Sequence, residues 1–159
     1  MLSSALLIGV GATLLMDLWN VLLKRGFGIR SLDYCLLGRW VSHMAAGTFR
    51  HASITAAAAR PGECLLGWVS HYSIGIGFAL GFLLLVGREW LDRPTPLPAV
   101  AFGLVTVAVP LFVMQPAIGL GIASSKTPHP ARARLKSLGT HLVFGVGLYA
   151  LALVWRFAG

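Results

Sequence analysis

Long apolar stretches alternate along the chain with shorter polar or basic segments. Four of the stretches are each about 20 residues long, the length that an α-helix needs to cross roughly 30 Å of hydrocarbon. They cover residues 2–23, 65–86, 97–119 and 138–157. The pattern predicts an all-α, multi-pass membrane protein with one membrane domain over residues 1–159, in which the four transmembrane helices form a bundle of two hairpins.

The segment between the first two spans contains a second helical pattern. Its apolar residues recur at three- and four-residue spacing, which predicts an amphipathic helix over residues 32–46 that lies in the membrane interface. Ser31 is placed to cap this helix, and Trp40 would sit at the level of the lipid headgroups.

Composition strengthens the membrane assignment. Hydrophobic residues make up 57% of the chain and charged residues only 11%, with a mean hydropathy of +0.78. A soluble domain would carry about 25% charged residues. No Lys or Arg precedes the first span and no clean cleavage site follows it, so we expect this span to be retained as an anchor rather than removed as a signal peptide.

The net charge of +8 is unevenly distributed. Most of the basic residues lie between spans one and two or between spans three and four. By the positive-inside rule both of these segments face the cytoplasm and both termini face outward. The charge therefore reports orientation and gives no reason to expect nucleic acid as a partner. In the second segment we expect contact with anionic lipid headgroups or phosphate, or else a solvated topology signal, from Lys126, Arg132, Arg134 and Lys136.

Two segments that contain histidine resemble each other. "SHYSIGIG" starts at residue 70 and "THLVFGVG" starts 70 residues later, and both follow the pattern Ser/Thr-His-x-x-x-Gly-x-Gly. A weaker echo links "LLMD" in span one to "FVMQ" in span three. The simplest interpretation is an internal repeat of one hairpin, inserted twice in the same orientation. The alternative is a chance match, since Gly and apolar residues are frequent in membrane helices.

Each span places one strongly polar side chain at a similar depth. Asp17, His71, Gln115 and His141 all lie roughly 5 to 10 Å from the predicted cytoplasmic interface, counted at about 1.5 Å per residue. A carboxylate that faces lipid costs several kcal/mol, so we expect Asp17 to face the bundle interior and to pair with a histidine. Further residues could support this polar site: Asn20, Ser70, Tyr72, Gly75, Thr140 and Gly145.

Glycines accompany both histidines. Gly75 and Gly145 lie one helical turn after His71 and His141, and each leaves a notch on the same helix face. Such a notch admits either a closely packed helix or a planar ligand, for which haem b with the two histidines as axial ligands is the obvious case. The GxxxG pair of Gly77 and Gly81 is also expected to favour helix packing.

The two cysteines give no recognisable motif. Cys35 and Cys64 have neither CxxC nor zinc-site spacing, and no secretory cysteine framework surrounds them. We therefore expect two small apolar side chains, without a disulfide or a metal site.

Motifs along nearly the whole chain resemble a known family. They are "GVGATLLMDLW", "SLDY...GRWVSHM..G.FRH.SI", "GE..LGWVSHY.IGIGFA", "VMQPAIGLGIASSKTP" and "RLKSLGTH..FGVGLY". In this order they resemble an uncharacterised bacterial family of small inner-membrane proteins, classified as a domain of unknown function. The resemblance implies four spans in the bacterial inner membrane, which would put both predicted termini on the periplasmic side. It implies no activity.

Three functions remain open from the sequence. The first is transport or proton-coupled permeation of a small solute through the polar site, by a four-helix unit that forms a homodimer. The second is an accessory or assembly subunit of a larger membrane complex, in which the polar side chains only hold helices together. The third is a haem- or metal-binding redox module. A membrane enzyme that acts on lipid headgroups has the least support, because the sequence contains no nucleophile-base-acid set, and no resident cofactor is predicted.

Overall fold

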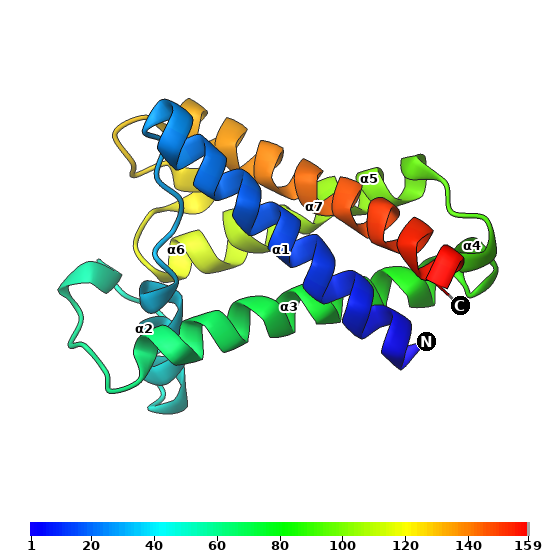
Figure 1. Cartoon of the computed structure of the whole chain (residues 1–159). Coiled ribbons are helices and arrows are strands. Elements are labelled where there is room, and N and C mark those ends of the chain that lie inside the picture. The colour runs from blue at the N-terminus through cyan, green and yellow to red at the C-terminus, as the bar shows by residue number, and fades with distance from the viewer. Residues whose placement is uncertain (159) are drawn as a thin grey trace. The chain divides into compact units, whose positions relative to one another are not determined.

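The computed structural model describes residues 1–158, and these residues form helices and connecting loops without a strand (Figure 1). Four helical segments are long and apolar enough to cross a membrane, which confirms the predicted fold class. They are Leu2–Phe27, Glu63–Val86, Pro96–Ala117 and Pro130–Phe157. The chain is therefore a multi-pass membrane protein.

The first membrane helix, α1 (Leu2–Phe27), extends four residues beyond its predicted end. Gly28 stops it in the left-handed conformation, at φ 67°, and its N–H donates to the carbonyl groups of Leu23 and Lys24. Lys24 and Arg25 lie in the last turn, where basic side chains interact favourably with the negative end of the helix. The basic residues thus belong to the helix itself rather than to the loop.

The third apolar stretch is interrupted by its prolines. Helix α5 (Pro96–Thr106) is followed by a π-helical turn, η2 (Pro110–Met114), and by the single turn α6 (Gln115–Ala117). Within η2 the N–H of Gln115 donates to the carbonyl of Pro110, five residues earlier. Proline lacks an N–H and cannot continue a regular α-helix, which accounts for the wider turn at this point.

The chain divides into two compact units, which are described separately. The first unit contains residues 1–31, 72–106 and the described residues from 138 onward. Its core is formed by α1, the later part of α3 (Glu63–Val86), α5 and α7 (Pro130–Ala158). The short helix α4 (Glu89–Asp92) closes one end, where Trp90 meets the edge of Phe82 at a centroid distance of 4.8 Å.

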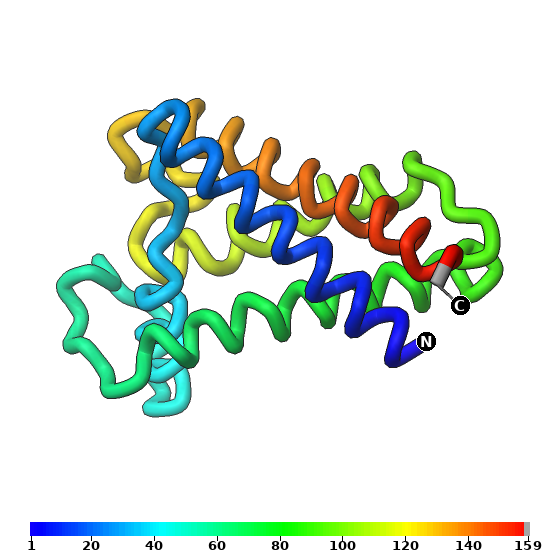
Figure 2. Tube along the Cα trace, viewed as in Figure 1, coloured from blue at the N-terminus to red at the C-terminus, as the bar shows by residue number. Residues whose placement is uncertain are grey.

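Small residues bring the helices of the first unit into close contact. A Cβ built on Gly9 would lie 2.6 Å from the Cα of Ile76, and one built on Gly147 would lie 2.8 Å from the Cα of Ala12. Figure 2 shows the trace of α1 passing both α3 and α7. Backbone contact of this kind is typical of membrane helices, where dispersion forces replace the hydrophobic effect between helices.

The second unit contains residues 32–71 and 107–137. Its elements are α2 (Tyr34–Ala45), η1 (Ile54–Ala56), the start of α3, η2, α6, η3 (Ile122–Ser124) and the start of α7. Two backbone hydrogen bonds join the segment after α2 to the end of α6: His51 N–H to Ala117 O at 2.8 Å and Ile54 N–H to Ile118 O at 3.1 Å.

Helix α2 lies within the predicted range 32–46 but has a different cap. The side chain of Asp33, not that of Ser31, accepts a hydrogen bond from the Cys35 N–H at 2.9 Å. An aspartate at this position satisfies a free N–H and places negative charge at the positive end of the helix. The position of α2 in the membrane interface stays a prediction.

Candidate functional site

The four residues of the predicted polar site are distributed over both units. Asp17 and His141 belong to the first unit, and His71 and Gln115 belong to the second. Each of the four has a polar or ring partner within its own unit. The contacts of each residue are therefore known within its own unit, and a site shared by all four residues stays a prediction.

Asp17 on α1 interacts with Tyr72 on α3. The Tyr72 hydroxyl donates to Oδ2 of Asp17 at 3.1 Å, and both side chains are partly buried. Tyr72 is one of the residues that the sequence indicated as support for the polar site. The bond joins two membrane helices and supplies a donor to a carboxylate that would otherwise be costly in hydrocarbon.

His141 on α7 interacts with Thr106 at the end of α5. The distance from Thr106 Oγ1 to His141 Nδ1 is 2.8 Å, and the same hydroxyl donates to the Gly103 carbonyl at 2.6 Å. A hydroxyl has one proton, so if Gly103 receives it, Nδ1 of His141 must be the donor in the second bond. In that arrangement a neutral ring carries its proton on Nδ1, and Nε2 is the acceptor.

A third polar contact links α1 to α7. The Thr140 hydroxyl donates to Oδ1 of Asn20 at 3.4 Å, and Asn20 is buried. Polar contacts in the first unit thus connect α1 with α3, α1 with α7, and α5 with α7. These contacts are hydrogen bonds that hold neighbouring helices together.

His71 and Gln115 have other surroundings in the second unit. The His71 ring is buried and stacks on Tyr34, with the centroids 4.0 Å apart, and meets the edge of Trp68 at 6.1 Å. The Oε1 of Gln115 accepts from the Ser124 hydroxyl at 2.8 Å, and both residues are buried. Gln115 therefore holds the turn η3, where Ser124 has a left-handed backbone with φ 60°.

Neighbouring helices fill the notches beside the two histidines. A Cβ on Gly75 would meet the hydroxyl oxygen of Thr13, whose own hydroxyl donates to the Gly9 carbonyl at 2.7 Å. A Cβ on Gly145 would lie 2.8 Å from the carbonyl oxygen of Ala99. In the structure a neighbouring helix therefore occupies the space beside each glycine, which is one of the two occupants that the sequence left open, and haem binding stays a prediction.

The two glycine crossings have similar parts. In α1 a threonine hydroxyl bonds to the carbonyl of Gly9, and in α5 another bonds to the carbonyl of Gly103. Each of these segments packs on one of the repeated glycines, Gly75 or Gly145. The similarity agrees with the predicted internal repeat, which stays a prediction. The pair Gly77 and Gly81 is different, because no other helix of the described chain lies within 4 Å of a Cβ built on either glycine, and helix packing on this pair stays a prediction.

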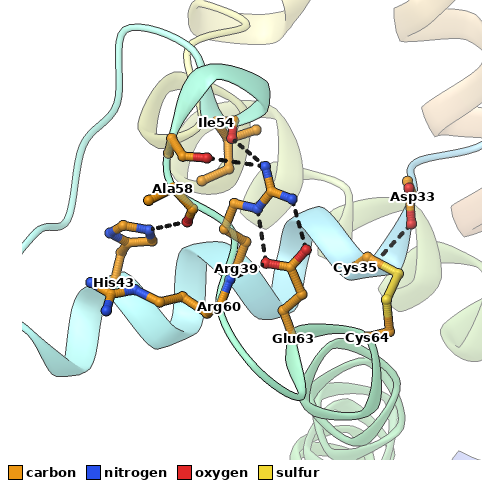
Figure 3. Close-up of polar contacts among 10 residues, drawn as sticks. Asp33, Cys35, Arg39, His43, Ile54, Ala58, Arg60, Glu63 and Cys64 are labelled. Atoms are coloured by element: carbon orange, nitrogen blue, oxygen red, sulfur yellow. Dashed lines mark hydrogen bonds and ion pairs between the residues drawn. A yellow bond between two sulfur atoms is a disulfide. The ribbon is translucent and has the colours of Figure 1, made fainter.

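The expectation for the cysteines is wrong as well. Cys35 and Cys64 form a disulfide that joins the first turns of α2 and α3 (Figure 3). The sequence carries a signal for this pairing: the tetrapeptide "CLLG" occurs at residues 35–38 and again at 64–67. The spacing between the two cysteines does not indicate the pairing, because the sulfur atoms meet where two helices pack against each other and not within one short loop.

An ion pair lies beside the disulfide. Arg39 binds Glu63 through two parallel hydrogen bonds, Nε to Oε2 at 2.9 Å and Nη2 to Oε1 at 2.7 Å (Figure 3). The remaining Nη1 donates to the carbonyls of Ile54 and Ala57, and the backbone N–H of Arg60 donates to the same carboxylate. The bond to Glu63 raises the pKa of Arg39, so the guanidinium stays charged.

The predicted headgroup contact lies in the second unit. Lys126, Arg132 and Arg134 are exposed, while Lys136 is half-buried. Arg134 also donates from Nε to the Ala123 carbonyl at 2.8 Å, which ties the start of α7 to η3. Contact of these side chains with lipid or phosphate stays a prediction.

Among the described residues no group of three or more His, Cys, Asp and Glu side chains could hold a metal ion. Fold and polar contacts together define a four-span, all-helical membrane protein whose membrane helices are joined by buried polar bonds. The chain belongs to the family described as "Protein of unknown function (DUF2938)", whose model matches residues 6–155. Comparison with curated proteins and with solved structures gives no match.

Proposed function

We propose that this protein is an accessory or assembly subunit of a larger membrane complex, in which the polar side chains within the spans hold its own helices together. The observation that supports this most is the filling of both glycine notches by neighbouring helices. The hydroxyl partners of Asp17, Asn20 and His141 support it too, since they occupy these polar groups with interhelical bonds.

The proposed location is the bacterial inner membrane, with the two basic segments in the cytoplasm and both termini on the periplasmic side. The distribution of Lys and Arg along the sequence supports this orientation. The exposed basic side chains near the start of α7 would then lie next to anionic headgroups, each contributing about 1 kcal/mol of attraction.

Purification from the native membrane tests the proposed role. We expect the tagged protein to retain a partner membrane protein at fixed stoichiometry in mild detergent. The conservative variant His141→Gln should retain the same partner, because it keeps a polar side chain opposite Thr106. A folded protein that purifies only as a monomer or as a homodimer, with no heterologous partner, would contradict the proposal.

Proton-coupled transport is the second candidate. Asp17 favours it, because this is the one carboxylate of the sequence that lies well inside an apolar span, and the Tyr72 hydroxyl could exchange a proton with it. On this candidate, purified protein in liposomes would conduct protons or a coupled solute, and Asp17→Asn would abolish the flux while the protein still inserts. Equal fluxes from wild type, Asp17→Asn and empty liposomes would remove the candidate.

A further inference from the structure

The crossing between α2 and α3 is built from two copies of one tetrapeptide. We call it the cysteine crossing and define it by Cys35, Gly38, Cys64 and Gly67. Each cysteine is the second residue of its helix, and the two Cα atoms lie 3.9 Å apart. In both copies the glycine follows three residues later, on the same helix face as the cysteine.

Glycine permits this approach in a reciprocal way. A Cβ on Gly38 would collide with the carbonyl of Glu63, and a Cβ on Gly67 would collide with the carbonyl of Tyr34. Glu63 and Tyr34 are the residues immediately before the two cysteines. The same pair of backbone contacts therefore occurs on both sides of the crossing, and it brings the sulfur atoms together.

The crossing does not depend on the disulfide alone. The two-bond ion pair between Arg39 and Glu63 joins the same two helices, with side-chain exposures of 15% and 13%. Tyr34 on α2 also packs on Trp68 and His71 of α3. We expect these contacts to hold the two thiols next to each other when the disulfide is reduced, so that the bond can form again within the molecule.

The two cysteine residues differ in exposure. Cys64 is exposed, whereas Cys35 is half-buried. Both cysteines lie in the first turn of a helix, whose positive end stabilises a thiolate, so the difference in charge comes from the neighbouring carboxylates. The neighbouring carboxylate of Glu63 is neutralised by Arg39, while the carboxylate of Asp33 lies at the Cys35 backbone. Both differences make Cys64 the more reactive cysteine.

The predicted orientation determines the compartment in which the disulfide lies. The last turn of α1 and the segment that follows it carry six basic residues, which places this end of the span in the cytoplasm by the positive-inside rule. Disulfides in a reducing cytosol are usually transient, catalytic or redox-sensing rather than structural. The Cys35–Cys64 disulfide is compatible with the predicted cytoplasmic location if it is reversibly reduced and re-oxidised.

We propose that Cys35 and Cys64 form a reversible dithiol–disulfide site that exchanges electrons with dithiol proteins at the cytoplasmic end of α3. The proposal goes beyond the proposed function and rests only on the orientation stated there. Cys64 is the residue that reacts with the external thiol, and Cys35 is the residue that resolves the intermediate. The description of the family names no such site.

In the reducing direction, a thiolate of the external dithiol attacks Sγ of Cys64. The Cys35–Cys64 bond breaks, Cys35 leaves as a thiolate that takes up a proton, and a mixed disulfide forms on Cys64. The second thiol of the external dithiol, as its thiolate, then attacks the first sulfur of the same dithiol, which is bonded to Cys64 in the mixed disulfide. Cys64 leaves as a thiolate and takes up a proton. Two electrons and two protons pass to the cysteine pair, and the external dithiol becomes a disulfide.

Redox titration of the purified full-length protein is the first test. We expect dithiothreitol to reduce the folded protein, so that thiol-reactive polyethylene glycol adds two mass steps, and oxidised glutathione to remove both. The helical circular dichroism should stay unchanged through the cycle, because the glycine contacts and the ion pair remain. A pair that reacts with excess dithiothreitol only after denaturation would overturn the proposal, as would thiols that never form the disulfide.

Acid trapping of the pair in growing cells tests the compartment. We expect both thiols to be at least partly reduced in untreated cells, fully oxidised after treatment with diamide, and reduced again after its removal. A pair that is fully oxidised throughout would identify a structural disulfide on the outer face and would overturn the proposal. The co-purification experiment is independent of this outcome, so failure of one proposal is distinguishable from failure of the other.

Single variants test the assigned roles. Free Cys64 in Cys35→Ser should react with a water-soluble maleimide roughly tenfold faster than free Cys35 in Cys64→Ser, because exposure and thiolate character set the rate. With an external dithiol-protein disulfide, Cys35→Ser should accumulate a mixed disulfide and Cys64→Ser should not. The reverse order of reactivity would overturn the assignment. The double Ser variant serves as the unreactive control.

Discussion

At the scale of single residues, hydroxyl groups serve the polar side chains within the apolar stretches. Tyr72 donates to Asp17, Thr140 to Asn20, and Ser124 to Gln115, while Thr106 contacts His141. A hydroxyl group adds little unfavourable free energy to a membrane helix, because it can donate to a carbonyl of its own helix when it has no other partner. Each of these four polar residues thus has a hydroxyl group as a neighbour, and one shared site stays a prediction.

The Tyr72→Phe variant tests the contact with Asp17. It removes one donor from a partly buried carboxylate, and we expect the free energy of unfolding to fall by about 1 to 2 kcal/mol. Unfolding in mixed micelles, followed by circular dichroism, measures the loss. Tyr149→Phe is the matched control, since Tyr149 packs against the apolar core of the same unit. Equal stability of both variants would show that the Tyr72 bond contributes nothing.

At the scale of helices, glycine positions decide which surfaces meet. Gly145 and Gly75 pack against neighbours, whereas Gly77, only two residues after Gly75, has none within the described chain. The same residue type in the same helix therefore has opposite roles, and the register of the helix determines which. The sequence motif GxxxG cannot make this distinction, because it does not say which face a partner covers.

Gly145→Ala should destabilise the protein by roughly 1 to 3 kcal/mol, because the new methyl group meets backbone atoms of α5 that cannot move aside. Gly77→Ala is the matched control on an open face. There we expect a neutral effect or a gain of up to about 1 kcal/mol from helix propensity. The same unfolding measurement serves both variants, and a cost at Gly77 equal to that at Gly145 would contradict the packing described.

At the scale of the whole molecule, the long apolar stretches were enough to predict the number of spans and the all-helical fold. The contacts between helices were not predictable to the same degree. The sequence did not single out the bond from Tyr72 to Asp17, because hydropathy fixes depth but not rotation about the helix axis, and pairing of Asp17 with a histidine stays a prediction. The disulfide was missed because two equal "CLLG" motifs bring the sulfurs together only where the helices cross.

Orientation is the property of the whole molecule on which the redox proposal rests. In the double Ser background, a cysteine at Ser125 should react with a membrane-impermeant maleimide only after the inner membrane is permeabilised, because Ser125 is exposed in the second basic segment. A cysteine at Asp92, exposed in the segment between spans two and three, should react without that step. Labelling with the opposite pattern would place the basic segments outside.

A double-mutant cycle on Thr106 and His141 tests the central claim most directly, namely that polar side chains within the spans bind the helices to one another. The four proteins are wild type, Thr106→Val, His141→Phe and the double variant, and the measured quantity is the free energy of unfolding in mixed micelles. The bond at 2.8 Å predicts a favourable coupling of about 0.5 to 1.5 kcal/mol. Additive losses, with no coupling between the two positions, would contradict the account.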